Sequence, residues 1–314
     1  MSVQSYRPKF LLRNGHFNTV YPALFRKQEV PDYIRREIAT NDNDFIHVDL
    51  LEGGYKKLAV LCHGLEGSSS SQYIVATGGL LHSNGWDIAA VNYRGCSGVI
   101  NNQLRMYHSG ATDDLQLVID SVIGDYDEIV LIGFSLGGNL CLKYTGENQG
   151  KLHSKITRTI AVSVPVDLKA GSINIGKRSN RIYENNFLNT LTEKILEKHK
   201  QFPNDIDLSL LKEMKKLYDF DDMYTGPIHG FNNAENYYAQ CSSKQFLPLI
   251  NIPTIIINAL DDPFLPKECY PFEVVKANKY LEMMVPKYGG HVGFVERNKK
   301  HYWIEKTILQ WLQK

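Results

Sequence analysis

A strand-like run that ends abruptly at a serine between two glycines constrains this chain most. Residues 129–133 are apolar or β-favouring, residues 136–144 have the composition of a helix, and Ser135 stands between them. The local sequence Gly-Phe-Ser-Leu-Gly matches the G-x-S-x-G pattern of a nucleophile elbow. A direct reversal from strand to helix forces the turn residue toward positive φ, and it leaves no room for side chains at the flanking positions. The turn therefore exposes the Ser135 hydroxyl and points the Leu136 N–H at whatever the serine attacks.

Buried-strand and helical patterns alternate along the first half of the chain. Such alternation is typical of a parallel sheet with crossover helices, and it places the chain in the α/β class. We expect strands at 45–50, 57–62, 86–92, 129–133 and 156–164, with helices at 73–82, 113–122 and 136–144. Later strands are expected at 254–258 and 280–285, and a closing helix at 303–312. Residues 1–40 show no clear period, so we expect short helices or loops packed on the sheet there.

Between the strand at 156–164 and the next one lie some eighty residues without a strand pattern. A structureless loop of that length is implausible inside a compact domain. We therefore predict a helical cap at 170–245, inserted into a core made of residues 1–169 and 246–314. Its helices are expected at 187–199 and 208–220. Seven cap aromatics are candidates to line an acyl pocket: Tyr183, Phe187, Phe220, Tyr224, Phe231, Tyr237 and Tyr238.

Charge and composition exclude several classes of partner. The net charge of +1 leaves no electrostatic footprint for nucleic acid or an anionic membrane. The five cysteines are scattered without a C-x-x-C pair, which predicts reduced thiols and a cytoplasmic protein without a structural zinc site. Residues 1–10 lack an apolar signal core, and no apolar run is long enough to span a bilayer, so we expect no stable membrane anchor.

A serine hydroxyl becomes a useful nucleophile only when a base takes its proton. In folds with a nucleophile elbow the order along the chain is serine, acid, histidine, and each group follows a strand. Asp261 and Asp262 both follow the expected strand at 254–258, and His291 lies in a glycine-rich loop after the strand at 280–285. An activated serine with backbone donors needs no metal ion or organic cofactor, so we predict none.

Taken together, the motifs resemble one group within the α/β-hydrolases. The group includes bacterial YheT-type hydrolases, yeast medium-chain ethyl-ester synthase/esterases and the animal ABHD1, ABHD2 and ABHD3 proteins. The resemblance runs from about residue 10 to the C-terminus. It rests on His63-Gly-Leu-Glu-Gly67, Asn92-Tyr-Arg-Gly-Cys96, Tyr107-His-Ser-Gly110, Gly133-Phe-Ser-Leu-Gly-Gly-Asn139, Gly230-Phe-Asn-Asn-Ala-Glu-Asn-Tyr-Tyr238, Asp261-Asp-Pro-Phe264 and Gly289-Gly-His-Val-Gly293.

The resemblance implies an α/β-hydrolase fold: a mostly parallel sheet flanked by helices, with an inserted helical cap. It implies Ser135 as nucleophile, His291 as base and Asp262 as acid, since Asp262 lies four residues before Pro266; Asp261 is the runner-up. It also implies an oxyanion hole from the N–H groups of Leu65 and Leu136. The expected activity is hydrolysis of small-molecule carboxylic esters with short to medium acyl chains. The hydrophobic N-terminal anchor of the animal members has no counterpart in this sequence.

Two other functions fit the same pattern. An acyltransferase would pass the acyl group from the same acyl-enzyme to an alcohol, and a cap that excludes water would favour it. A catalytically idle binding protein would keep the scaffold without needing the three catalytic residue types. The stretch from His108 to Asp113 spells H-x-x-x-x-D, a string found in some acyltransferases, but we interpret it as a loop entering a helix that Asp113 or Thr112 caps.

Overall fold

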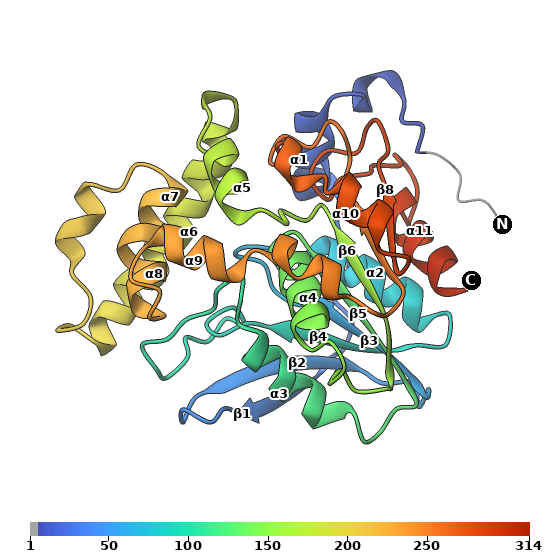
Figure 1. Cartoon of the computed structure of the whole chain (residues 1–314), viewed down its shortest axis with the longest axis horizontal. Coiled ribbons are helices and arrows are strands. Elements are labelled where there is room, and N and C mark those ends of the chain that lie inside the picture. The colour runs from blue at the N-terminus through green and yellow to red at the C-terminus, as the bar shows by residue number, and fades with distance from the viewer. Residues whose placement is uncertain (1–5) are drawn as a thin grey trace.

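One eight-stranded sheet, covered by helices, organises the computed structural model, which describes residues 6–314 (Figure 1). The strand order is β1-β2-β4-β3-β5-β6-β7-β8. β2 runs antiparallel to its neighbours β1 and β4, and every other pair of neighbours is parallel. The predicted sheet with crossover helices is therefore confirmed. Residues 1–5, which belong to the stretch where we expect no signal core, lie outside the described residues.

Most predicted elements agree with the observed ones to within two residues. The strands are β1 (Ile34–Ala39), β2 (Phe45–Leu51), β3 (Lys57–Cys62), β4 (Asp87–Asn92), β5 (Glu128–Phe134), β6 (Ile156–Val162), β7 (Thr254–Ile257) and β8 (Leu281–Met284). The helices outside the β6–β7 connection are α1 (Gly15–Phe25), α2 (Gln72–His82), α3 (Thr112–Val122), α4 (Leu136–Glu147), α10 (Phe272–Ala277) and α11 (Trp303–Leu312). Short 3₁₀ turns occur at Phe10–Leu12, Arg178–Asn180, Leu208–Lys212, Ser243–Gln245, Leu247–Leu249 and Lys267–Cys269.

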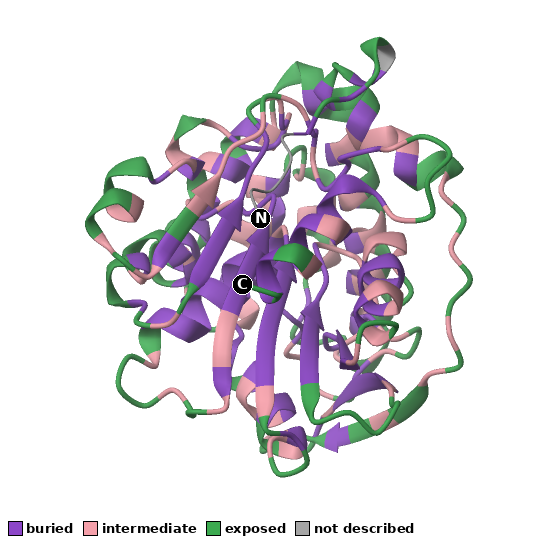
Figure 2. Cartoon of the chain, turned by 90° about the vertical axis from the view of Figure 1, so that its right-hand side faces the viewer, coloured by how far each residue is buried: buried purple, intermediate pink, exposed green. Residues whose placement is uncertain are grey.

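The central strands are buried on both faces, as Figure 2 shows for the middle of the molecule. Successive side chains of a strand point to opposite faces. In β3, Val60 packs into a cluster with residues of α3 and α4, whereas its neighbour Leu61 packs with residues of α2 and α11. This two-sided burial explains why the central strands have continuous apolar runs instead of alternating patterns.

Strand β1 was not predicted. The expectation of only helices or loops in residues 1–40 is wrong for Ile34–Ala39, although α1 agrees with it. β1 lies at the sheet edge and pairs only with β2, so most of its side chains reach solvent. Its sequence, Ile-Arg-Arg-Glu-Ile-Ala, carries charges of the kind that protect edge strands from pairing with other chains. Those charges hide the alternation that identifies a strand.

The long connection from β6 to β7 is helical (Figure 1, yellow-green to orange). It contains α5 (Leu168–Ile175), α6 (Arg181–Gln201), α7 (Leu217–Phe220), a π-helical turn at Asp221–Thr225, α8 (Gly226–Ile228) and α9 (Ala234–Cys241). Its buried apolar residues, among them Leu191, Ile195 and Phe220, form a cluster together with Met106. The exact division into core and cap at residues 170 and 245 stays a prediction.

The helix expected at 208–220 is broken, so that prediction is wrong. A 3₁₀ turn ends at Lys212, and α7 begins only at Leu217. The Asp219 carboxylate accepts hydrogen bonds from the N–H groups of Lys215 and Lys216, both at 2.9 Å. These bonds start a new helix, because a side-chain acceptor there satisfies donors that a helix terminus leaves unpaired.

The helices of residues 6–314 include none that combines the length and the apolar character needed to cross a membrane.

Candidate active site

The connection from β5 to α4 has the geometry that the G-x-S-x-G pattern predicts. Ser135 has a φ of 53°, a left-handed conformation that non-glycine residues rarely adopt. A Cβ on Gly133 would lie 2.1 Å from the carbonyl oxygen of Gly137, and one on Gly137 would lie 2.3 Å from that of Cys62. Both positions therefore require glycine, since backbone atoms occupy the space of a side chain. Ser135 is thereby held at the end of β5, with α4 beginning at the next residue.

A tight turn after β3 carries the second predicted backbone donor, Leu65. A would-be Cβ on Gly64 lies 3.2 Å from the Ser135 Cβ, so this turn borders the serine. The buried His63 ring donates from Nδ1 to the Gly64 carbonyl oxygen over 2.7 Å. Burial lowers the pKa of His63 to about 3, so the ring is neutral. Because C=O and N–H point in opposite directions in a trans peptide, the bond at Gly64 turns the Leu65 N–H away from His63.

The two predicted oxyanion donors are available to a ligand. Across residues 6–314, neither the Leu65 N–H nor the Leu136 N–H donates a hydrogen bond to another protein group. Leu136 is the first residue of α4, where a helix leaves its N–H groups without intrahelical partners. Both residues line the same cavity as Ser135. The arrangement is suited to stabilising negative charge on an oxygen atom bound beside the serine.

The predicted acid and base are in direct contact. His291 Nδ1 lies 2.9 and 3.1 Å from the two carboxylate oxygens of Asp262. The Asp262 side chain is fully buried, and its Oδ1 also accepts the Phe264 N–H at 2.9 Å. This pairing fixes the ring so that its other nitrogen, Nε2, is the one available to take a proton.

Asp261 makes no hydrogen bond to the histidine ring. Its Oδ1 accepts the Gly290 N–H at 2.9 Å, and its buried Oδ2 has no hydrogen-bond partner. Burial raises the pKa of this carboxyl, and the nearby Asp262 raises it further. Asp261 therefore shapes the loop that carries His291 instead of contacting the ring.

Ser163 connects the histidine loop to the strand beside Ser135. The Ser135 N–H donates to the Val162 carbonyl oxygen over 2.8 Å, and the next residue, Ser163, accepts the Val292 N–H at 2.9 Å. Phe264 adds a second connection, because it lines the serine's cavity and its ring lies 4.3 Å from that of His291. The loops after β5, β6, β7 and β8 thus meet at one edge of the sheet, where open α/β sheets bind ligands.

Two residues that hold the histidine loop, Ser163 and Thr19, have no signal in the sequence. Ser163 has a φ of 50° at the end of β6, but nothing local distinguishes it from an ordinary loop serine. Thr19 of α1 accepts the His291 N–H at 2.8 Å and donates to the Gly15 carbonyl oxygen over 2.7 Å. The partners lie 272 positions apart in the sequence, so no local pattern could have paired them.

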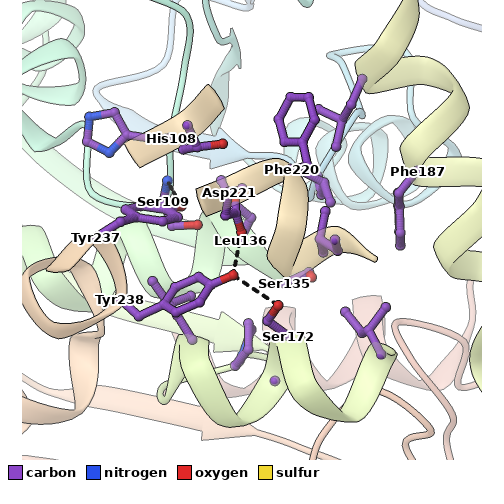
Figure 3. A pocket seen from close by; sticks show the side chains of 18 of the residues that line it. His108, Ser109, Ser135, Leu136, Ser172, Phe187, Phe220, Asp221, Tyr237 and Tyr238 are labelled. Carbon is purple, nitrogen blue, oxygen red and sulfur yellow. Dashed lines mark hydrogen bonds between the residues drawn. The ribbon is translucent and has the colours of Figure 1, made fainter. Parts of the chain in front are cut away.

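The cavity over Ser135 is mostly apolar and is enclosed by helices of the β6–β7 connection (Figure 3). The cavity and the open solvent at its mouth together make up about 870 Å³ of space not filled by protein atoms. Four of the seven candidate aromatics line it: Phe187, Phe220, Tyr237 and Tyr238. Its polar groups include a chain in which the Tyr238 hydroxyl lies 2.7 Å from Asp221 and 2.9 Å from Ser172 (Figure 3). Burial raises the pKa of Asp221 to about 6.

The H-x-x-x-x-D string does not form a second catalytic pair. The His108 Nδ1 accepts the Gly110 N–H at 3.2 Å, and its ring packs against His229. Asp113 instead pairs with Arg105 at 2.7 Å, near the protein surface. α3 begins at Thr112 without a side-chain cap, so the expected capping by Asp113 or Thr112 is wrong.

Comparisons with known proteins agree on the fold. Residues 58–297 match the family model described as alpha/beta hydrolase fold. The putative esterase YheT of Escherichia coli is 33% identical over 311 residues, covering 95% of this chain and 90% of the relative. The human phospholipase ABHD3 is 29% identical, with 99% and 79% covered. A solved esterase structure from Pyrococcus furiosus superposes with a TM-score of 0.60 at 16% identity, covering 90% of both chains.

Proposed function

Because this chain belongs to the α/β-hydrolase family, we propose that it is a serine hydrolase that cleaves small-molecule carboxylic esters. The family membership confirms the fold and the resemblance predicted from the motifs. Two relatives carry the names putative esterase and phospholipase, and an acyl ester is the chemical feature that substrates of such enzymes share. We therefore propose that this chain also cleaves an acyl ester bond.

In the proposed mechanism Ser135 attacks the ester carbonyl carbon while His291 takes the hydroxyl proton through Nε2. Asp262 holds the imidazole in the required tautomer and stabilises the imidazolium that forms. The carbonyl oxygen becomes negatively charged and accepts hydrogen bonds from the N–H groups of Leu65 and Leu136. The alcohol leaves with the proton from His291, and a water molecule activated by the same histidine then hydrolyses the acyl-enzyme.

The observation that carries this proposal is the position of Ser135. It sits in a strained turn that lines an apolar cavity, beside two unpaired backbone donors, and the loops after β7 and β8 bring together the buried Asp262 and its partner His291. A structural serine would need none of these features. The helices over residues 170–245 act as a cap in this proposal, and the cavity beneath them accepts the short to medium acyl chain. The five cysteines are free and buried, which is compatible with the cytoplasmic location that we retain as part of the proposal.

The test is hydrolysis of p-nitrophenyl esters from acetate to decanoate. Each buried methylene is worth about 0.8 kcal/mol, so kcat/KM is expected to rise up to several-fold per carbon until the cavity is filled, and then to fall. The Ser135→Ala variant should lose activity by a factor on the order of 10³ or more while remaining folded. Wild-type turnover in that variant would refute the proposal. Adding an alcohol acceptor to the same assay measures transfer against hydrolysis, and faster transfer than hydrolysis would make the protein an acyltransferase.

A further inference from the structure

The turn that carries Leu65 contains an unusual residue. The Gly67 N–H donates to the Gly64 carbonyl oxygen over 3.0 Å, which closes a four-residue turn with Leu65 and Glu66 at its centre. Glu66 has a φ of 56°, whereas Leu65 is not among the described residues with positive φ. This combination defines a type II turn, which favours glycine or asparagine at the position that Glu66 occupies. Glutamate is therefore an unusual residue at this position of the turn.

Tyr107 holds both the backbone and the side chain of Glu66. The Glu66 N–H donates to the Tyr107 hydroxyl oxygen over 2.9 Å, and that hydroxyl donates to Glu66 Oε1 over 2.5 Å. Type I and type II turns differ in the orientation of their central peptide, which here joins Leu65 to Glu66. The bond from the Glu66 N–H therefore selects the type II form.

Lys194, on the long helix α6 of the β6–β7 connection, is the third residue of this network with Glu66 and Tyr107. Lys194 Nζ lies 2.8 Å from the same Glu66 Oε1, and its ammonium group sits 5.0 Å from the centre of the Tyr107 ring. The two charged side chains are 19% and 7% exposed, so water screens this ion pair little. Burial lowers the pKa of Lys194, but the Cys96 thiol and the Glu66 carboxylate outweigh burial and raise it overall. Lys194 and Tyr107 also line the cavity that contains Ser135.

We propose that Glu66 is a positioning residue, which holds the Leu65 N–H in the oxyanion hole and connects it through Lys194 to the cap. This inference rests on the proposed function and adds to it a residue that positions one of the two oxyanion-hole donors. The Leu65 N–H belongs to the Gly64–Leu65 peptide, whose carbonyl oxygen accepts from His63 and Gly67, so loss of the Glu66 side chain does not flip this donor. It releases the turn from Lys194 and lets the donor shift out of position. Because the oxyanion forms only after attack, a displaced donor lowers kcat and leaves KM nearly unchanged.

The Glu66→Gly variant separates this role from a purely structural one. Glycine is the preferred residue at positive φ, so the variant is expected to fold with a melting temperature at or above that of the wild type. If the side chain positions the donor, kcat for the best p-nitrophenyl ester falls about 10- to 100-fold, while KM changes less than about threefold. Affinity for an alkyl trifluoromethyl ketone, which forms an oxyanion adduct with the serine, should fall by a similar factor. Glu66→Gln, which can still accept both hydrogen bonds, should recover most of the lost kcat.

Lys194→Ala tests the connection to the cap. It should lower kcat in the same way as Glu66→Gly, and the double variant should be little worse than either single one, because both remove the same link. Lys200→Ala is the matched control: Lys200 lies on the same helix and pairs with Glu197 at 2.5 Å, but both side chains are more than half exposed. It should leave kcat unchanged.

Full kcat in the Glu66→Gly variant would overturn the positioning role. A loss of kcat that comes with a lower melting temperature would also overturn it, because the side chain would then act on stability. So would additive losses in the double variant. None of these results would affect the proposed function as long as Ser135→Ala is inactive. An active Ser135→Ala variant would refute the proposed function itself, whatever Glu66 does.

Discussion

At the scale of single residues, the site depends on neighbours in sequence that have different surroundings. Asp261 and Asp262 both follow the same strand, and in the sequence only the spacing before Pro266 favours Asp262. Only Asp262 contacts the His291 ring, whereas Asp261 accepts a backbone N–H from the loop that carries the ring. The assignment of Asp262 as the acid stays a prediction, and it now rests on hydrogen bonds in addition to the spacing before Pro266.

We expect Asp262→Asn to lower kcat by about 10⁴, because an amide at this position stabilises the wrong tautomer of the histidine and cannot stabilise the imidazolium. Asp261→Asn should lower kcat less than about tenfold, since Asn keeps an oxygen acceptor for the Gly290 N–H. Steady-state kinetics on the two variants, with melting curves as the folding control, measure the difference. The reverse ranking would move the acid to Asp261.

Local sequence signals predicted some of these residues and not others. Ser135 and His291 stand out because the chemistry needs glycine-rich turns around them, and such turns can be read from a few neighbouring residues. Ser163, Thr19 and Glu66 act through partners that are distant in the sequence, and each is an ordinary polar residue in its local context. Their roles follow only from the fold, because hydrogen-bond partners of this kind leave no periodic or compositional pattern.

At the scale of elements, the sequence predicts the bounds of the β5–α4 connection more accurately than those of the cap helices. β5 ends and α4 begins within one residue of the expected positions because the elbow tolerates little variation. The cap was predicted as helical, but its helices break where single side chains capture backbone donors, as Asp219 does before α7. Such local hydrogen bonds compete with helix propensity, and a pattern of apolar residues does not reveal them.

A methyl group added at the elbow should be far more harmful than one added to an open helix. Gly133→Ala would place a carbon atom 2.1 Å from the Gly137 carbonyl oxygen, so we expect a loss of at least ~3 kcal/mol of stability or no folded protein. Gly79→Ala in α2 is the matched control, because its new Cβ meets nothing within 4 Å. It should raise stability by about 0.5–1 kcal/mol. Urea unfolding of both variants provides the measurement, and similar stabilities would contradict the geometry of the elbow.

Asp221 should give the cap a measurable pH dependence. Burial raises its pKa from 3.8 to about 6, so the folded state binds the proton more tightly than the unfolded state does. The resulting stabilisation is fully present below pH 3.8 and is lost as the pH rises through about 6. The total change is roughly 3 kcal/mol, since one pH unit corresponds to about 1.4 kcal/mol.

The Asp221→Asn variant removes this titration. Its stability relative to the wild type should therefore increase between pH 4 and pH 7, by up to roughly 3 kcal/mol. Urea unfolding of both proteins across this range isolates the contribution of Asp221, because the other titrating groups are common to both. A difference in stability that does not vary with pH would show that Asp221 keeps an ordinary pKa in the folded protein.

At the scale of the whole molecule, the sheet brings together groups that are far apart in the sequence. Ser135, Asp262 and His291 follow β5, β7 and β8, whose carboxyl ends lie at one edge of the sheet. The cap enters after β6, at this same edge, and because β6 and β7 are parallel the chain then crosses to the opposite edge to begin β7. The parallel order of these strands was predictable from the alternation of elements, whereas the edge strand β1 was not, because its charged side chains hide its period.

The proposal that Ser135 is the activated nucleophile of an ester hydrolase can be tested directly with an alkyl fluorophosphonate. Such a reagent phosphonylates an activated serine with loss of fluoride, and the adduct can be located by mass spectrometry. We expect one adduct per chain, on the peptide that contains Ser135, with esterase activity falling in proportion to labelling. We expect no adduct in the Ser135→Ala variant. Esterase activity that survives complete labelling of Ser135, or an adduct on a different residue that tracks the loss of activity, would contradict the proposal.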